Sequence, residues 1–330
     1  MRIAFLVNRA ETEVDEYTTT RLAKAAALMG HEVWYVGLSD VSIGEPDGEI
    51  GAHAHPGIAR DQDTLTAFID RMKGSSREHI RMDELDAVFL RNDSVEDRQD
   101  RPWASSLGSM FGQLLVAHGV TVVNNPAVLM RAALKAYLDE FPAQIRPHSL
   151  VTQNVDDVRN FIASEGRSII KPLCGAQGRN VFMVVSDDEP NLNQMMEAVL
   201  EDGYIYAQGY VEGAEDGDMR IFLLDGELIE VDGHPSAFRR VPEGNDPRAN
   251  ICKGGRVQPE EVTEKQHAVI EAMHDKLAQD GMFFVGIDMI GDKVIEINAE
   301  SPGGLQAMEH LYGVDICPAV IEALERRSSA

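Results

Sequence analysis

Short apolar runs alternate with amphipathic segments through the first third of the chain. The apolar runs predict strands over residues 2–7, 31–37, 85–91 and 119–125. The intervening segments predict helices over 18–30 and 103–118, and a turn-rich stretch predicts a hairpin over 44–57. Strands that alternate with helices form a parallel sheet with helices on both faces, so this region is predicted to be an α/β domain.

The pattern changes near residue 126, and strands joined by short turns become more frequent. A helix, or two short ones, is predicted over 125–142. Strands and hairpins follow over 166–185, 202–213, 217–234 and 283–298, with a polar loop at 239–259 and a helix at 260–280. We therefore expect three parts, namely an N-terminal domain (1–125), a central subdomain (126–205) and a C-terminal subdomain (206–330) that carries the metal and substrate site.

The last predicted hairpin carries polar side chains in an otherwise apolar segment. Its two strands pair around a turn, which brings Asp288 near Glu296. Asn298 shares a face with Glu296 because side chains alternate along a strand. The alternative is an exposed polar face, but the surrounding residues are apolar enough that unpaired carboxylates would be costly there. Two carboxylates and an amide oxygen suit Mg²⁺, so the hairpin predicts a magnesium site.

A second group of residues is basic and glycine-rich. Lys171 ends a predicted buried strand, and Gly175 and Gly178 follow in the next turn. Glycines allow backbone N–H groups to approach phosphate oxygens, and a lysine supplies positive charge. A single G-x-x-G turn is weak evidence, and a plain hairpin turn is its default interpretation. The phosphate interpretation gains weight from other basic residues along the chain, which are Lys135, Arg220 and Arg256.

Composition narrows the class of protein. The net charge is −25 and the pI is near 4.7, which argue against general affinity for nucleic acid or anionic membranes. No apolar run approaches the roughly 18 residues that a membrane span needs. The three cysteines, Cys174, Cys252 and Cys317, have no metal-binding or disulfide-like spacing. We expect a cytoplasmic protein with no membrane or nucleic-acid partner.

Several segments, taken in order, resemble the ATP-grasp ligases, and among them bacterial glutathione synthetase most closely. They extend over nearly the whole chain: "FLRND" (89–93), "VVNNP" (122–126), "LKAYLDEF" (134–141), "IIKPLCGAQG" (169–178), "YAQGYV" (206–211), "GDMRIFLLDGE" (217–227), "RANICKGGR" (248–256) and "FVGIDMIGDKVIEINAESP" (284–302). The resemblance implies an α/β protein in which an ATP-grasp fold follows a Rossmann-like, parallel-sheet domain.

The resemblance also implies a role for particular residues at the nucleotide. Two lysines would contact the phosphates and adenine, two glycines would lie in a flap over the phosphates, a hinge segment would contact adenine and ribose, and an aspartate would lie beside the nucleotide. These residues are Lys135, Lys171, Gly175, Gly178, Gln208, Tyr210, Val211 and Asp218. The family's magnesium ligands fall on Asp288, Glu296 and Asn298.

At the reacting groups, the resemblance implies three catalytic residues, Arg220, Asn250 and Arg256. Arg220 would lie near the amine acceptor, whereas Asn250 and Arg256 would belong to a loop that closes over the acyl intermediate. The substrate residues would be Arg91, Ser301, Gly303 and Gly304.

The implied reaction is amide or peptide bond formation through an acyl phosphate, with release of ADP and phosphate. It implies ATP and Mg²⁺ as cofactors, with Mn²⁺ as an alternative metal, amino acid or peptide substrates, and a dimeric or tetrameric homo-oligomer. The flap "CGAQG" and the final turn "NAESPGG" depart from glutathione synthetases, and the turn is closer to ligases that add glutamate to ribosomal protein or other acceptors. Three alternatives therefore stay open: a ligase for another peptide or metabolite, a non-catalytic ATP-binding regulator, and a small-molecule kinase.

Overall fold

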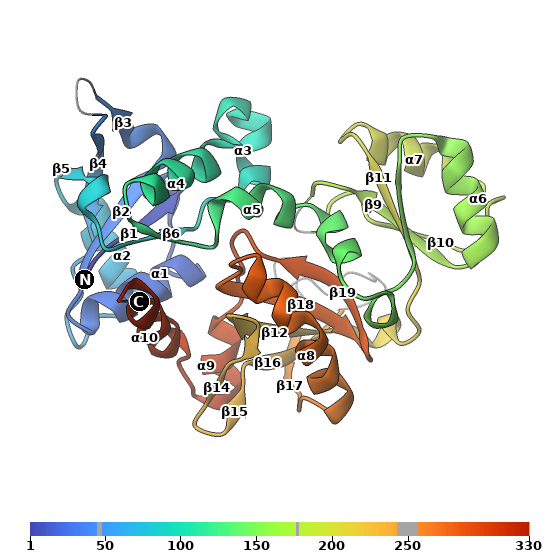
Figure 1. The fold of residues 1–330 in the computed structure, drawn as a ribbon. Coiled ribbons are helices and arrows are strands. Elements are labelled where there is room, and N and C mark those ends of the chain that lie inside the picture. The colour runs from blue at the N-terminus through green and yellow to red at the C-terminus, as the bar shows by residue number, and fades with distance from the viewer. Residues whose placement is uncertain (45–47, 176–177, 243–255, 330) are drawn as a thin grey trace.

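The structure is a computed structural model that describes residues 1–44, 48–175, 178–242 and 256–329 (Figure 1). Its strands form three main sheets. Within the described residues, no helix is long and apolar enough to cross a bilayer. Asn250 and Cys252 lie outside the described residues.

The N-terminal sheet has a parallel centre and an antiparallel edge. Its parallel strands are β1 (Arg2–Val7), β2 (Glu32–Gly37), β6 (Ala87–Leu90) and β7 (Thr121–Val123), in the order β2-β1-β6-β7. Antiparallel strands extend the sheet beyond β2, and these are β3 (Val41–Ile43), β4 (Ile50–Pro56) and β5 (Glu78–Arg81). The predicted parallel strands are confirmed, and the predicted hairpin is β3–β4, which starts three residues earlier than expected.

Helices cover both faces of this sheet because alternate residues of its strands are apolar on both sides. Ile3 and Phe5 pack in one apolar cluster with α1 (Thr18–Leu28), α2 (Leu65–Gly74) and α10 (Cys317–Ser328). Ala4 and Leu6 belong to another cluster that contains α4 (Leu107–Ala117) and α5 (Pro126–Ala132). A further helix, α3 (Ser94–Asp100), follows β6. The C-terminal helix α10 thus returns to the N-terminal domain and lies against α1 (Figure 1).

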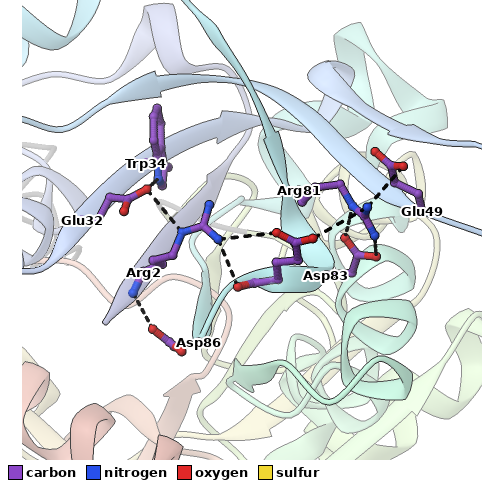
Figure 2. A network of polar contacts seen from close by, with 8 residues as sticks. Arg2, Glu32, Trp34, Glu49, Arg81, Asp83 and Asp86 are labelled. Carbon is purple, nitrogen blue, oxygen red and sulfur yellow. Dashed lines mark hydrogen bonds and ion pairs between the residues drawn. The ribbon is translucent and has the colours of Figure 1, made fainter.

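A network of charged residues lies at the amino ends of the parallel strands (Figure 2). The Arg2 backbone N–H donates to Asp86 at 2.6 Å, and the Arg2 guanidinium pairs with Glu32 at 3.3 Å. Arg81 pairs with Asp83 at 2.7 Å. These contacts are partly exposed, so each contributes at most about 1 kcal/mol. The carboxyl ends of β1 and β6, at the opposite edge, are left for other interactions.

The second sheet is small and stands to one side of the molecule (Figure 1). Its order is β10-β9-β11-β8, all antiparallel, with two helices packed on it. The elements are β8 (Ser149–Thr152), α6 (Val155–Glu165), β9 (Ser168–Pro172), β10 (Phe182–Val184), α7 (Leu192–Leu200) and β11 (Ile205–Gly209). An apolar cluster of its own supports this unit. Because β11 pairs with β8 and β9, we propose that the central subdomain extends to Gly209, beyond the predicted division at 205.

The third sheet has the order β17-β16-β12-β18-β19, with β13 paired to β12. Its strands are β12 (Asp218–Leu224), β13 (Glu227–Leu228), β16 (Ala237–Val241), β17 (Arg256–Pro259), β18 (Phe284–Ile290) and β19 (Lys293–Asn298). The hairpin β14 (Glu230–Val231)–β15 (His234–Pro235) and helices α8 (Glu264–Gln279) and α9 (Gln306–Tyr312) complete this region. The predicted hairpins at 217–234 and 283–298 and the predicted helix at 260–280 are confirmed. The loop expected at 239–259 has a strand at each end.

The N-terminal and third sheets share their apolar core. Leu90 of β6 belongs to the same buried cluster as Ile287 of β18. The ring of Phe89 also lies edge-on to the rings of Phe283 and Phe284, at centroid distances of 6.0 and 6.3 Å. These two sheets therefore form one packed body, whereas the small second sheet has a separate apolar cluster.

Asn124, directly after β7, joins the two sheets through its amide side chain. Its Nδ2 donates to the carbonyls of Phe284 (2.9 Å) and Ala299 (2.6 Å), and its Oδ1 accepts from the Phe284 N–H (2.7 Å). The side chain is buried, with 3% of Asn124 exposed. All three partners are backbone groups, and hydrogen bonds of this kind satisfy such groups away from water.

We predict that Asn124→Ala lowers the free energy of unfolding by about 3 kcal/mol, since it leaves buried backbone groups unpaired. The matched control is Asn125→Ala, which removes only a helix cap on Ala127 and should cost about 1 kcal/mol. Urea unfolding followed by circular dichroism measures both. Equal losses in the two variants would contradict the bridging role of Asn124.

Candidate active site

Basic and acidic side chains meet where the small second sheet approaches β19. Lys171, at the end of β9, donates to Gln208 Oε1 of β11 at 3.0 Å, and Gln208 Nε2 donates to the Ile295 carbonyl of β19 at 3.4 Å. Lys135 opens the 3₁₀ helix Lys135–Glu140, and its Nζ lies 3.2 Å from Glu296 Oε1. The structure thus brings four residues predicted from the sequence into one place.

The electrostatics of this group follow from burial and from the two lysines. The pKa of Lys171 is lowered to about 8, mainly because the ammonium group is buried; the charge of Glu296 opposes this shift and the charge of Lys135 adds to it. Burial raises the pKa of Glu296, but the charges of Lys135 and Lys171 outweigh burial and leave this pKa below its usual value. Two ammonium groups beside a single carboxylate leave surplus positive charge, which suits a polyphosphate.

A second cluster of charges lies beneath the first, in the third sheet. Arg240 of β16 holds both carboxylate oxygens of Asp218 at 2.6 and 2.8 Å, and its Nη2 also lies 2.9 Å from Asp288 Oδ2. Arg220 of β12 binds the same Asp288 carboxylate through Nε and through Nη2, the latter at 2.9 Å. Burial raises the pKa of Asp288, but the two arginines outweigh burial, so the pKa is well below its usual value. Sequence reasoning missed Arg240.

The predicted magnesium ligands lie together, although they differ in what already contacts them. Asp288 and Glu296 are cross-strand partners, as predicted, and Asn298 Nδ2 donates to Asp288 Oδ2 at 3.3 Å. Asp288 keeps 1% of its side chain exposed and accepts from both arginines, whereas Glu296 keeps 32% exposed. Among the residues described, no hydrogen bond reaches Glu296 Oε2 or Asn298 Oδ1. These free hard oxygens fit Mg²⁺.

The turn at 301–304 is fixed by two arginines that come from different sheets. Arg91, at the carboxyl end of β6, donates through Nη2 to the Pro302 carbonyl at 3.1 Å, and Ser301 Oγ donates to the Arg91 carbonyl at 3.2 Å. Arg220 Nη1 donates to the Gly303 carbonyl at 3.0 Å. Gly304 has φ of 109°, a conformation that favours glycine. The predicted substrate residues therefore surround one turn that follows directly from β19.

Of the remaining predicted residues, some lie at the margins of this site and Arg256 lies away from it. Tyr210, just after β11, donates to Glu215 at 2.7 Å and lies under the Arg167 guanidinium, with Val211 next in the chain. Gly175 accepts a hydrogen bond from Lys135 Nζ, and Gly178 has φ of 68°. Arg256 begins β17, at the edge of the third sheet opposite β19. The predicted catalytic residue Asn250 lies outside the described residues.

Glu13 is a buried carboxyl group near Arg91 that sequence reasoning missed. It follows β1 in the acidic segment "AETEVDEY", which reads as an exposed loop, yet only 5% of it is exposed. Burial raises its pKa to about 7, with Arg91 lowering it and Glu96 raising it. Glu13 Oε2 and Arg91 Nη1 are both buried without a hydrogen-bond partner in the part of the chain that is described.

Two domain models from a single family match the chain. "Prokaryotic glutathione synthetase, N-terminal domain" matches residues 1–130, and "Prokaryotic glutathione synthetase, ATP-grasp domain" matches residues 134–313. The chain is 31% identical to the glutathione synthetase of Synechococcus elongatus, over 98% of each chain. It is 30% identical to that of Vibrio cholerae, over 92% of this chain and 91% of the relative.

Solved structures agree on the fold. D-cycloserine synthetase DcsG superposes with a TM-score of 0.64 at 16% identity, over 99% of both chains. The ATP-grasp ligase PsnB complexed with its minimal precursor gives a TM-score of 0.63 at 20% identity, over 100% of this chain and 99% of the other. The predicted fold class is thereby confirmed: an ATP-grasp fold preceded by an N-terminal domain with a parallel sheet.

We predict that Glu13 makes the stability of the protein depend on pH. The folded pKa is raised from 4.5 to about 7, so the folded state retains a proton that the unfolded state releases in this window. The contribution of protonated Glu13 to the free energy of unfolding is therefore complete below pH 4.5 and is lost as pH rises through about 7. Glu13→Gln does not have this loss. Between pH 4.5 and about 7, its free energy of unfolding should therefore rise relative to that of the wild type by up to about 3 kcal/mol.

Denaturant unfolding at several pH values measures this difference, with the exposed neighbour Glu11→Gln as the matched control. The groups whose charges act on Glu13 are Arg91, Glu96 and Lys73, and none of them is changed in either variant. A stability difference that does not vary with pH would contradict the prediction.

Proposed function

Because the chain belongs to the prokaryotic glutathione synthetase family of ATP-grasp ligases, we propose that it joins the carboxylate of a γ-glutamyl dipeptide to the amine of a small amino acid. The enzyme is an ATP-dependent carboxylate–amine ligase that forms a C–N bond. Its curated relatives are named glutathione synthetase, so γ-glutamylcysteine and glycine are the first pair of substrates to test. Neither the non-catalytic regulator nor the small-molecule kinase is favoured by these relatives.

The observation that carries this proposal is the meeting of Lys135, Lys171 and Glu296 between the second sheet and β19. The two lysines supply surplus positive charge for the phosphates of ATP. Gln208, Tyr210 and Val211 lie on or just after β11, and we assign them to adenine and ribose. We assign Gly175 and Gly178 to the flap over the phosphates and Asp218 to the nucleotide side of the site.

The proposed reaction has two displacement steps. A carboxylate oxygen of the dipeptide attacks the γ-phosphorus of ATP, and the bond to the β-phosphate oxygen breaks, which gives an acyl phosphate and ADP. The acceptor amine then attacks the acyl carbon, loses a proton and expels phosphate. Little covalent chemistry falls to the protein, which aligns the reactants, neutralises charge and excludes water.

Three arginines and the metal ligands share the electrostatic work. We assign Arg220 and Arg256, with Asn250, to the charge that develops on the acyl group, and Arg91 with the turn Ser301, Gly303 and Gly304 to the substrates. Mg²⁺, with Mn²⁺ as the alternative, would be held by Asp288, Glu296 and Asn298 and would neutralise phosphate charge. The partly exposed Glu296 is the carboxylate whose loss should weaken metal binding most.

A different amine acceptor is the second candidate, and Glu300 favours it. This carboxyl group directly precedes the turn at 301–304, in the segment "NAESPGG" that departs from glutathione synthetases. Ser94 Oγ donates to its Oε2 at 2.8 Å, and burial raises its pKa to about 8. An acidic group beside the acceptor region changes which amines fit there.

Two further elements of the proposal concern assembly and compartment. We propose a dimer or tetramer of identical chains. The uncharged outer face of α4 supports this, because Met110 and Leu114 are 50% and 40% exposed there in a chain of net charge −25.

We also propose the cytoplasm as the compartment, which the free thiols of Cys174 and Cys317 support.

We predict that Glu296→Gln lowers the rate of ADP release on the order of 100-fold and raises the Mg²⁺ concentration needed for half-maximal rate, because it removes a charged metal ligand. A coupled ADP assay with γ-glutamylcysteine, glycine and Mg-ATP measures both effects. Glu271→Gln, on the exposed face of α8, is the matched control and should leave both quantities unchanged.

A screen that pairs γ-glutamyl peptides with single amino acids, followed by phosphate release, identifies the preferred acceptor. ATP turnover should require both substrates together. Full activity of Glu296→Gln would contradict the assigned metal site, and turnover without any amine would contradict the ligase reaction.

A further inference from the structure

The loops that follow β1 and β6 diverge at the carboxyl edge of the N-terminal sheet. The two strands are parallel neighbours, with Leu6 beside Leu90, but the chain leaves β1 toward β2 and leaves β6 toward β7, on opposite sides. In parallel sheets, a reversal of this kind opens a crevice at the strand ends, where ligands bind. The first loop carries Glu13 and the second begins with Arg91.

Glu13 and Arg91 lie in the two loops at this edge, and no hydrogen bond or ion pair joins them within the described residues. Glu13 and Arg91 are each 5% exposed, yet Glu13 Oε2 and Arg91 Nη1 have no hydrogen-bond partner within the described parts of the chain. The two groups sense each other electrostatically, since Glu13 raises the pKa of Arg91 and Arg91 lowers that of Glu13. Buried charged groups are normally paired, so two unpaired atoms of opposite charge are costly unless a ligand completes them.

The other donors of Arg91 direct it toward the proposed substrate. Its Nε donates to Thr19 Oγ1 in the first turn of α1 at 3.1 Å, and its Nη2 donates to the Pro302 carbonyl at 3.1 Å. These two contacts fix the guanidinium plane against the turn that follows β19. The unpaired Nη1 therefore belongs to a group already held beside the substrate turn.

We infer that Glu13 and Arg91 together bind the two charges of one amino-acid head group, with the carboxylate of Glu13 receiving its α-ammonium and Nη1 of Arg91 its α-carboxylate. This inference rests on the proposed function in taking the head group to be the γ-glutamyl end of the dipeptide. A γ-linked dipeptide carries a free ammonium and a free carboxylate on one carbon, as the pair requires. An α-linked dipeptide does not, because its first carboxyl group is part of the peptide bond.

In this pair, Glu13 would select ligands that carry an α-ammonium group, which an exposed glutamate of the same loop would not do. A ligand without the ammonium leaves the Glu13 carboxylate buried and unpaired, so it should bind weakly. Sites built to receive a charged group discriminate strongly against analogues that lack it. Glu13 is then a specificity-determining residue at the end of the substrate remote from the reacting carboxylate.

The test is calorimetric titration without ATP, using two ligands that differ by one amine. The ligands are γ-L-glutamyl-L-α-aminobutyrate, which has no thiol, and glutaryl-L-α-aminobutyrate, which lacks the α-ammonium. Wild-type protein should prefer the first ligand by about tenfold or more. In Glu13→Gln this preference should fall to about twofold, through weaker binding of the first ligand alone. Glu11→Gln, an exposed carboxylate in the same loop, should keep the wild-type preference.

Equal weakening of both ligands by Glu13→Gln, or the absence of a preference in the wild type, would overturn the inference. Circular dichroism at about pH 8 confirms that Glu13→Gln is folded, where removal of the buried charge is expected to stabilise it. The wild type could prefer the ligand with the α-ammonium group and yet release no phosphate when ATP and amino acids are added. That result would support the head-group site and contradict the ligase proposal. Conversely, the wild type could release phosphate with γ-glutamyl dipeptides and show no preference between the two ligands. That result would contradict the head-group site and leave the ligase proposal standing.

Discussion

The buried carboxylate of Asp288 is the interaction on which the rest of the site depends. It lies on β18, next to the edge strand β19, and accepts hydrogen bonds from Arg220 and Arg240, which come from strands on the other side of β18. Removing this carboxylate would leave two buried guanidinium groups without their main counter-charge, a loss of the kind that costs several kcal/mol. Asp288 thereby fixes the position of Arg220, and Arg220 in turn fixes the turn at Gly303.

This arrangement links three regions of the molecule that are far apart in the sequence. Arg91 connects the N-terminal sheet to the same turn that Arg220 reaches from the third sheet. Gln208, which accepts a hydrogen bond from Lys171, connects the small second sheet to the Ile295 carbonyl of β19. Since the second sheet has its own apolar cluster, these polar contacts are what a nucleotide bound between the sheets would replace or join. The proposed position of the nucleotide is therefore between parts of the protein that have separate apolar clusters.

Sequence patterns predicted the fold well where periodicity was strong. The parallel strands of the first sheet and the hairpin β18–β19 were expected because their apolar runs are bounded by glycines and turns. The pairing of Asp288 with Glu296 followed from the alternation of side chains. Helices α6, α7 and α10 were not predicted, since their apolar residues are interspersed with many charged or polar ones and become evident only against a sheet. The antiparallel strand β5 was also not predicted.

The site was predictable to the extent that its residues lie in short ordered motifs. Lys171 and Asn298 stand at or near strand ends that precede turns; the structure places Lys171 near Glu296 and Asn298 beside Asp288. Arg240 could not be singled out, because the double arginine at 239–240 gives no sign of which guanidinium is buried; the alternation of β16 decides this. Glu13 lies among three other acidic residues between positions 11 and 16, directly after the 3₁₀ turn Ala10–Thr12, and only tertiary packing distinguishes it from its exposed neighbours.

The central claim is that a substrate carboxylate is activated as an acyl phosphate, and an isotope measurement tests it most directly. The dipeptide is labelled with ¹⁸O in its reacting carboxylate and converted with Mg-ATP and the amine acceptor. Mass spectrometry of the released phosphate should show one ¹⁸O atom per molecule, because the carboxylate oxygen stays with phosphorus when the amine attacks. Phosphate without label, or label in AMP, would contradict the account.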